Sequence, residues 1–310
     1  MMKVLLVAEE AAGIQVLRRV ADSSHELVAV MTAPPTRGGG ATVASVADGL
    51  GVTVLPSERV REPGLGDWIR GREVDLLLNV HSLFVAHEEV VRAPLIGSFN
   101  LHPGPLPEYA GLNAPSWAIY QGEPRHAVTV HWMEPGIDTG AVAYESSFDL
   151  GDAETGLSLS LRCVREGLPL IEQLLEDADR DQIPAYPQDL SRRQYYGRQP
   201  PQGGRIEWAR PAREVVAFVR ACDYFPFPSP WGHPAAQLEG RALAVLKAAT
   251  SGEPTAERPG TVGAASATGI LVAAADEWIE LQRVSVDGEV ADAADVLSPG
   301  RRLDAGEVPA

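Results

Sequence analysis

The sequence predicts an α/β fold, in which a mostly parallel sheet covered by helices on both faces is followed by a small β domain. Strand-like and helix-like stretches alternate from the N-terminus to residue 102, which is typical of consecutive βαβ units. The composition shifts to Pro, Gln, Arg, Tyr and Gly between Ile183 and Gly204, which indicates a linker. Short strand-like runs separated by turn residues follow it. A length of 310 residues agrees with two domains.

The first strand and helix set the pattern of the first domain. Lys3–Ala8 is a continuous apolar run, as expected of a strand buried on both faces, and Ile14, Leu17 and Val20 recur at a helical spacing. The same alternation continues along the chain. It predicts further strands at Leu27–Met31, Thr53–Leu55, Asp75–Val80 and Gly97–His102. Between them it predicts a helix near Val43–Leu50, a helix containing Trp68 and Ile69, and the Val85–Val91 segment.

The remaining elements complete the two domains. Apolar residues from Leu157 to Leu175 recur every three or four positions, which predicts one long amphipathic helix closing the first domain. A helix near Ala212–Cys222 and a proline-rich turn at Asp223–Pro234 follow the linker. Four short strands are then expected: Leu243–Leu246, Gly260–Val262, Ile270–Ala273 and Trp278–Val284.

Composition excludes several classes of function. A formal net charge of −16 disfavours nucleic acid as a partner, and the arginines between 192 and 213 are interpreted as a salt-bridged linker. Cys163 and Cys222 are too few for a zinc site or a disulfide framework, so no metal is expected. Neither a signal peptide nor a membrane-spanning run is evident, so we expect a cytoplasmic protein with no membrane partner. Oligomeric state is not readable.

Two polar residues lie near the end of a predicted strand. Asn100 and His102 are two positions apart within Gly97–His102, so their side chains project to the same side. The carboxyl ends of strands in an open parallel sheet border the ligand-binding crevice. A donor amide beside an imidazole can polarise a carbonyl and move a proton. The pair alone is explained equally well by a structural Asn and a hydrogen-bonded His.

A carboxylate occurs in the glycine-bounded loop Glu134–Gly140, which follows the strand pattern Val128–Trp132. Asp138 in this loop could serve a catalytic role or simply cap its own turn. The Asp-Thr-Gly sequence is also found in aspartic proteases, but that mechanism needs two such carboxylates and only one occurs here.

Together the two clusters resemble the folate-dependent formyltransferases, in which Asn-Leu-His-Pro and Gly-Ile-Asp-Thr-Gly recur in this order and spacing. This family includes enzymes acting on methionyl-tRNA, amino sugars, hydroxyornithine and a purine precursor. Tyr196-Gly197-Arg198 and Ile206-Glu207-Trp208 resemble the family's linker. The resemblance implies a Rossmann-like catalytic domain over residues 1–190, a linker over 191–204 and an OB-like C-terminal domain over 205–310.

The resemblance also implies roles for individual residues. Asn100 would donate a hydrogen bond to the formyl oxygen, His102 would handle the amine proton and Asp138 would orient the imidazole. The formyl donor would be 10-formyltetrahydrofolate, with no metal. Its pteridine ring would be held largely by backbone of two loops: Ser82, Leu83, Phe84 and Val85, and Met133, Glu134, Pro135 and Gly136.

The acceptor is expected to be a small amine of specialised metabolism, such as an amino sugar or an N-hydroxyornithine-like amino acid. The loop Glu108–Asn113 lacks the arginines that the tRNA enzymes of this family carry. Tyr109 and Asn113 are the expected acceptor contacts, whereas the sequence does not decide whether Glu134 or Tyr144 takes part. The histidines His81, His126 and His131 are interpreted as structural.

Three other functions remain open. One is formylation of initiator tRNA, and another is hydrolysis of the folate to release formate. The hydrolases of this family usually carry an N-terminal regulatory domain, and none is expected before Lys3. The third is a folate-binding protein that has lost catalysis.

Overall fold

The computed structural model describes residues 1–34, 40–82 and 84–305. The chain forms two compact units, each built from more than one stretch of sequence. The first comprises Met1–Gly111, His126–Phe148 and Leu161–Tyr196, and the second comprises Leu112–Arg125, Asp149–Ser160 and Gly197–Ala310. The domain bounds inferred from the resemblance stay a prediction.

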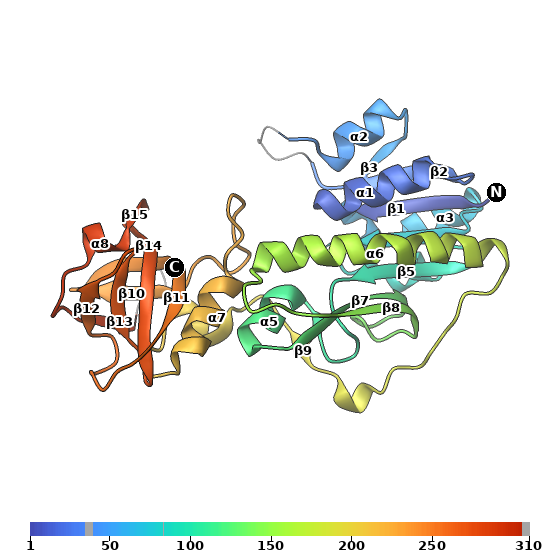
Figure 1. Cartoon of the computed structure of the whole chain (residues 1–310). Coiled ribbons are helices and arrows are strands. Elements are labelled where there is room, and N and C mark those ends of the chain that lie inside the picture. Colours follow the sequence, from blue (N-terminus) through green and yellow to red (C-terminus); the bar gives the residue numbers. More distant parts are fainter. Residues whose placement is uncertain (35–39, 83, 306–310) are drawn as a thin grey trace. The chain divides into compact units, whose positions relative to one another are not determined.

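A mostly parallel sheet forms the centre of the first unit (Figure 1). In the described residues its strand order is β3-β2-β1-β4-β5-β7-β8, with β1 to β5 parallel and β7 antiparallel to β5. The strands are β1 (Lys3–Ala8), β2 (Glu26–Thr32), β3 (Val54–Pro56), β4 (Leu76–Val80), β5 (Gly97–His102), β7 (Arg125–Trp132) and β8 (Val142–Asp149). The predicted α/β fold is thereby confirmed, with β1 and β5 at their expected bounds.

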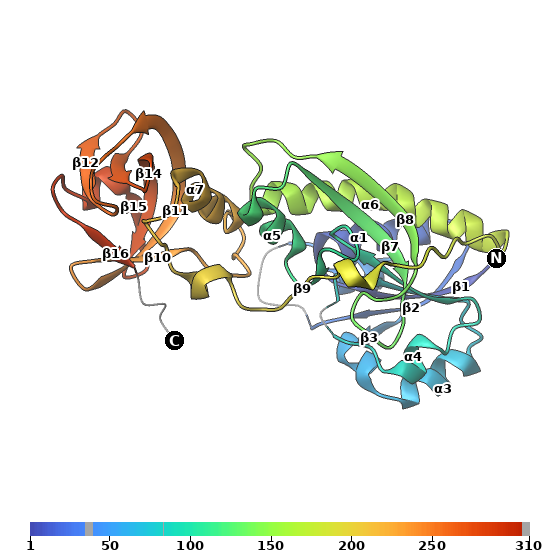
Figure 2. The same ribbon diagram turned by 90° about the horizontal axis from the view of Figure 1, so that it is seen from below.

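Helices cover both faces of this sheet because alternate residues of each central strand point to opposite sides. In β1, Val4 and Leu6 contact one hydrophobic cluster, whereas Leu5 and Val7 contact another. The first cluster is completed by α1 (Glu10–Ala21), α2 (Val43–Gly49) and α6 (Gly156–Asp179), and the second by η1 (Ser57–Arg61), α3 (Gly64–Gly71) and α4 (Glu88–Val91). Figure 2 shows α3 and α4 on the side of the sheet opposite to α1 and α6.

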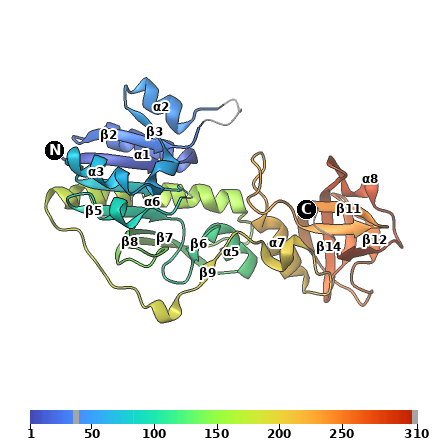
Figure 3. The same ribbon diagram turned by 180° about the vertical axis from the view of Figure 1, so that it is seen from behind.

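The second unit is a small antiparallel β domain, as predicted (Figure 3). Its core joins the sheet to α7 (Ala212–Ala221) and α8 (Ala293–Val296), and α5 (Ala114–Gln121) also belongs to this unit. The sheet strands are β10 (Ala235–Leu238), β11 (Arg241–Pro254), β12 (Val262–Ala265), β13 (Ile270–Ala273), β14 (Glu277–Val286), β15 (Glu289–Asp292) and β16 (Leu303–Ala305). The strand β11 runs well beyond the expected Leu243–Leu246, because shifts in its pairing with β14 let polar residues continue the ladder.

A short two-stranded ribbon was not expected from the sequence. It joins β6 (Ala110–Gly111) to β9 (Tyr195–Tyr196), and the short helices η2 (Leu190–Arg192) and η3 (Pro201–Gly204) flank β9. The segment read as a linker therefore begins as part of the first unit. Within the described residues, no helix has the length and apolar character needed to span a membrane.

Candidate active site

Three polar side chains form a row across neighbouring strands at the centre of the first unit. Asn79 on β4 is the register partner of Asn100 on β5, and Asn100 is the register partner of His131 on β7. All three lie on the sheet face opposite to Phe99 and Leu101, which belong to the core beneath α1 and α6. The strand pairing thus places two amides and an imidazole side by side.

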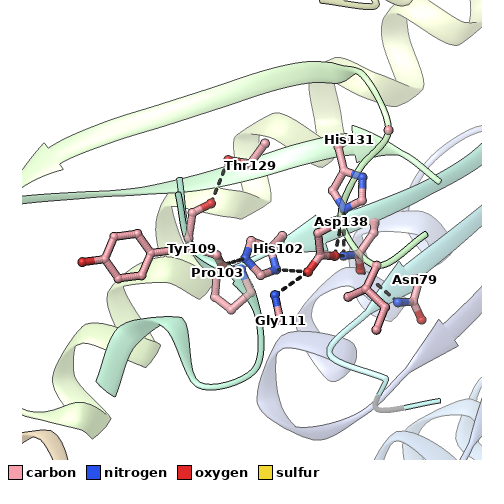
Figure 4. A network of polar contacts seen from close by, with 12 residues as sticks. Asn79, His102, Pro103, Tyr109, Gly111, Thr129, His131 and Asp138 are labelled. Carbon is pink, nitrogen blue, oxygen red and sulfur yellow. Dashed lines mark hydrogen bonds and ion pairs between the residues drawn. The ribbon is translucent and has the colours of Figure 1, made fainter. Parts of the chain in front are cut away.

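Asp138 brings a carboxylate to this row (Figure 4). Its Oδ1 lies 3.4 Å from Asn100 Nδ2 and 3.4 Å from His131 Nε2, and its Oδ2 lies 3.7 Å from His102 Nδ1. The Gly111 N–H donates to Oδ2 at 2.8 Å. The structure therefore brings together Asn100, His102 and Asp138, the three residues that the sequence singled out.

The Asp138 loop has a backbone conformation that only its surroundings can hold. Asp138 has φ of +56°, a left-handed conformation that is costly for a residue with a Cβ. A Cβ at Gly140 would lie 2.0 Å from the carbonyl oxygen of Trp132, so glycine is required where the loop passes the end of β7 before it enters β8. The position of the Asp138 carboxylate is consequently determined by the backbone conformation of the loop as well as by its side-chain rotamer.

Gln188 and Arg193, from the segment after α6, also hold this loop. Gln188 Nε2 donates to the carbonyl oxygens of Asp138, at 3.0 Å, and Gly140. Arg193 Nη2 donates to the carbonyl of Ile137 at 2.8 Å. These contacts join positions about 50 residues apart, and no sequence spacing indicated them.

His102 presents one particular nitrogen to the carboxylate. Its Nε2 lies 2.7 Å from the carbonyl oxygen of Tyr109, and a carbonyl can only accept, so Nε2 carries the hydrogen. In the neutral ring Nδ1 therefore keeps its lone pair and faces Asp138. His102 is buried, with an exposed fraction of 3%.

Burial and charge set the protonation states of this pair. Burial lowers the pKa of His102, and the opposing attraction of Asp138 does not fully cancel it. Burial would raise the pKa of Asp138, but the attraction of the protonated forms of His102 and His131, together with the Gly111 N–H, outweighs burial, so that pKa lies below its ordinary value. The resting site holds a neutral His102 beside an ionised Asp138.

His131 and Asn79 are site residues that the sequence reasoning missed. His131 is 2% exposed, its Nε2 is 3.1 Å from Asn100 Nδ2, and Asn79 Nδ2 donates to Asn100 Oδ1 at 2.9 Å. His131, interpreted as structural from the sequence, therefore lies in direct contact with Asn100 and close to Asp138. Asn79 interrupts the otherwise apolar strand β4, and that interruption was the available signal, whereas β7 also carries His126 and Thr129, so His131 did not stand out.

A cavity of about 440 Å³ adjoins the end of β7. Its lining includes Met133, Glu134 and Pro135, three of the residues expected to bind folate, together with Val91 and Ser98. The other expected residues are not among its lining residues. Gly136 N donates to the Glu134 carbonyl, Phe84 packs on the same core cluster as Met133, Ser82 Oγ accepts from Phe84 N, Val85 is exposed, and Leu83 lies outside the described residues.

The expected acceptor residues have different surroundings. Tyr109 is buried, with its ring stacked on Tyr196 at 5.4 Å between centroids and set edge-on to His126. Asn113 has φ of +59° and occupies the N-cap position of α5 in the second unit, without a capping hydrogen bond from its side chain. Tyr144 is buried and its hydroxyl donates to Asp177 Oδ2 at 2.8 Å.

No group of three metal-ligating side chains close enough to hold an ion occurs in the described part of the chain.

Comparison with known proteins identifies the family of both units. The family model described as formyl transferase matches residues 2–169, and the formyl transferase C-terminal domain matches residues 200–299. The methionyl-tRNA formyltransferase of Sorangium cellulosum is 30% identical over 261 residues, covering 84% of this chain and 82% of that protein. The corresponding protein of Alcanivorax borkumensis is 27% identical, with coverage of 88% and 83%.

Solved structures show the same fold. An N-formyltransferase from Helicobacter canadensis, in complex with folinic acid and dTDP-3-aminofucose, superposes with a TM-score of 0.66 at 16% identity, covering 91% of this chain and 99% of that chain. HypX from Aquifex aeolicus, in complex with tetrahydrofolic acid, gives a TM-score of 0.65 at 18% identity, with coverage of 96% and 47%. With family models matching both parts of its sequence, the chain belongs to the formyltransferase family.

Proposed function

We propose that this protein transfers the formyl group of 10-formyltetrahydrofolate to the amino group of a small molecule. The carrying observation is that the carboxamide of Asn100 and the neutral imidazole of His102 converge on the ionised carboxylate of Asp138. Formyl transfer to an amine builds negative charge on the formyl oxygen and positive charge on the attacking nitrogen. A hydrogen-bond donor and a proton acceptor are therefore both needed.

Each residue has a distinct role in this proposal. Asn100 donates from Nδ2 to the formyl oxygen as it becomes an oxyanion. His102 accepts the proton of the attacking amine at Nδ1, because Nε2 is already bound to the Tyr109 carbonyl. Asp138 stabilises the resulting imidazolium, and His102 then returns the proton to the folate nitrogen as the bond from that nitrogen to the formyl carbon breaks.

The residues around the 440 Å³ cavity suit the pteridine of the formyl donor. A cavity of this size is in the range of ligand sites, and Val91, Met133 and Pro135 offer apolar walls to a flat ring. Ser82, Phe84, Val85 and Gly136 complete the proposed folate site together with Glu134. The folates named with the solved relatives support this donor.

A small amine is favoured as the acceptor over tRNA. The net charge is −16, which disfavours binding to the phosphates of tRNA. In addition, Glu108, the acidic residue of the loop after β5, forms an ion pair with Arg192 and so engages the positive charge of that arginine. Tyr109 and Asn113 remain the proposed acceptor residues. The names of the curated relatives favour methionyl-tRNA instead, which makes initiator tRNA the second candidate.

One assay separates these acceptors. Purified protein is incubated with 10-formyltetrahydrofolate and, separately, with nucleotide-linked amino sugars, N-hydroxyornithine or charged initiator tRNA, and formation of each formylated product is followed by mass spectrometry. We expect a small amine to be formylated and the tRNA not. Efficient formylation of the tRNA at physiological salt would contradict the acceptor assignment.

A binding protein without catalysis gives a different result. Such a protein would bind the folate, by calorimetry, yet form no product with any acceptor, and the same binding would persist in His102→Ala. Single-turnover transfer by wild-type protein that is absent in His102→Ala would exclude this alternative.

A further inference from the structure

His131 is placed to act on the carboxamide of Asn100. Its Nδ1 lies 2.8 Å from the carbonyl oxygen of Trp132, so Nδ1 carries the hydrogen and the neutral ring keeps its lone pair on Nε2. That lone pair faces Asn100 Nδ2 at 3.1 Å. His131 is therefore an acceptor for one of the two amide hydrogens of Asn100.

The opposite end of the carboxamide is fixed by Asn79. Asn79 Nδ2 donates to Asn100 Oδ1 at 2.9 Å. Rotating the Asn100 amide by 180° would place its oxygen against the lone pair of His131 and the carboxylate of Asp138, and its NH₂ against that of Asn79. All three neighbours thus favour the same orientation of the amide. The rotated orientation would set acceptor against acceptor at His131 and Asp138, and donor against donor at Asn79.

The two amide hydrogens of Asn100 are held unequally. The contact to His131 is 3.1 Å, whereas the contact to Asp138 Oδ1 is 3.4 Å, at the long end of the hydrogen-bond range. The hydrogen facing Asp138 is the one that can be redirected to a formyl oxygen. His131 fixes the first hydrogen and so determines where the second one points.

We propose that His131, backed by Asn79, is a positioning residue that holds the Asn100 carboxamide in its oxyanion-binding orientation by accepting one of its hydrogens. This rests on the proposed formyl transfer, but the hydrogen bond itself can be observed without turnover. The charged or titratable side chains facing His131 are Asp138 and, across a ring-centroid distance of 6.5 Å, His102. Neither can replace the acceptor that Asn100 needs, since Asp138 already takes the other hydrogen.

The hydrogen bond is tested first by NMR. The chain contains three asparagines, Asn79, Asn100 and Asn113, so asparagine-selective ¹⁵N labelling gives a simple set of side-chain amides. With histidine also labelled, a coupling across the hydrogen bond between Asn100 Nδ2 and His131 Nε2 is expected at neutral pH. Signals are assigned by their loss in Asn100→Ala. Absence of this coupling in folded wild-type protein overturns the inference, whether or not formyl transfer has been found.

Kinetics then test the role through a double-mutant cycle. His131→Phe should lower kcat roughly 10- to 10²-fold with little change in the folate KM, as expected when a reacting group is displaced. In an Asn100→Ala background, His131→Phe should lower kcat no further, because His131 acts through Asn100. An equal loss in both backgrounds overturns the proposal.

A conservative variant distinguishes positioning from folding. His131→Gln retains an acceptor oxygen and should recover most of the kcat lost in His131→Phe, even where both variants lose similar stability. His126→Gln, on the same strand but bonded to the Pro103 carbonyl, is the matched control and should leave kcat unchanged. If His131→Gln is as slow as His131→Phe while folded, acceptance by residue 131 is not what supports catalysis.

Discussion

A single hydrogen bond to a backbone carbonyl determines which nitrogen of His102 is basic. Because Tyr109 O binds Nε2–H, the basic lone pair lies on Nδ1, beside Asp138. A histidine held in this way cannot exchange tautomers without losing a buried hydrogen bond. The geometry therefore assigns base and orienting carboxylate to particular atoms.

Removing the imidazole should remove most of the catalysis. His102→Ala is expected to lower kcat by about 10²–10⁴, the usual contribution of a positioned acid–base group, with folate affinity retained. Single-turnover rates and folate binding by calorimetry measure the two quantities separately. A near-normal kcat in this variant would place the base elsewhere, with His131 the first candidate on distance from Asp138.

The charge of Asp138 should be visible in the pH profile. Burial lowers the pKa of His102 and Asp138 raises it, so Asp138→Asn leaves burial less opposed and lowers that pKa further. We expect kcat to fall and the acidic limb of its pH profile to move to lower pH. An acidic limb that moves to higher pH, or stays in place, would show that the limb does not report His102.

At the scale of elements, the loop carrying Asp138 is held by the chain that follows α6. Gln188 and Arg193 bind three carbonyls of this loop, and β9 pairs with β6, whose Gly111 N–H donates to Asp138. The stretch that the composition marks as a linker thus also supports the site.

Releasing this support should loosen the carboxylate. Gln188→Leu removes both hydrogen bonds to the loop, and we expect kcat to fall roughly tenfold or more as Asp138 leaves its left-handed conformation. Gln173→Leu, at an exposed position on α6, is the matched control. Amide exchange of residues 134–140, followed by mass spectrometry, should quicken only in Gln188→Leu. Unchanged exchange and kcat would show that Gln188 does not hold the loop.

At the scale of the whole molecule, buried neutral histidines make stability depend on pH. His126 is buried, and this burial lowers its pKa from 6.5 to about 4, even though its Nε2–H donates to the Pro103 carbonyl. His102 is shifted in the same direction. The unfolded chain takes up these protons at a higher pH than the folded chain does. Their contribution to stability is therefore present above pH 6.5 and is lost as the pH falls toward 4.

Acid unfolding of the His126→Gln variant tests this dependence. Glutamine can keep a donor to Pro103 but takes up no proton, so the slope of unfolding free energy against pH should fall by about 1.4 kcal/mol per pH unit between 6.5 and 4. Urea titrations of both proteins across this range measure the slope. Identical slopes would show that His126 titrates normally in the folded protein.

The sequence by itself determined the fold class, the core strands and the identity of the catalytic candidates. A continuous apolar run such as that of β1 admits few other structures, and Asn100, His102 and Asp138 occur in motifs shared with a known family. Local spacing and motif carried this information.

Only the tertiary structure decided which other side chains surround these three. Asn79 and His131 join Asn100 through strand register, and Gln188 reaches Asp138 from 50 residues away along the chain. Which nitrogen of His102 is basic depends on a carbonyl that a turn brings near it. Register and long-range contacts follow from packing of the whole sheet, which no local pattern encodes, because each strand fixes only which face its residues occupy and not which residues lie beside them.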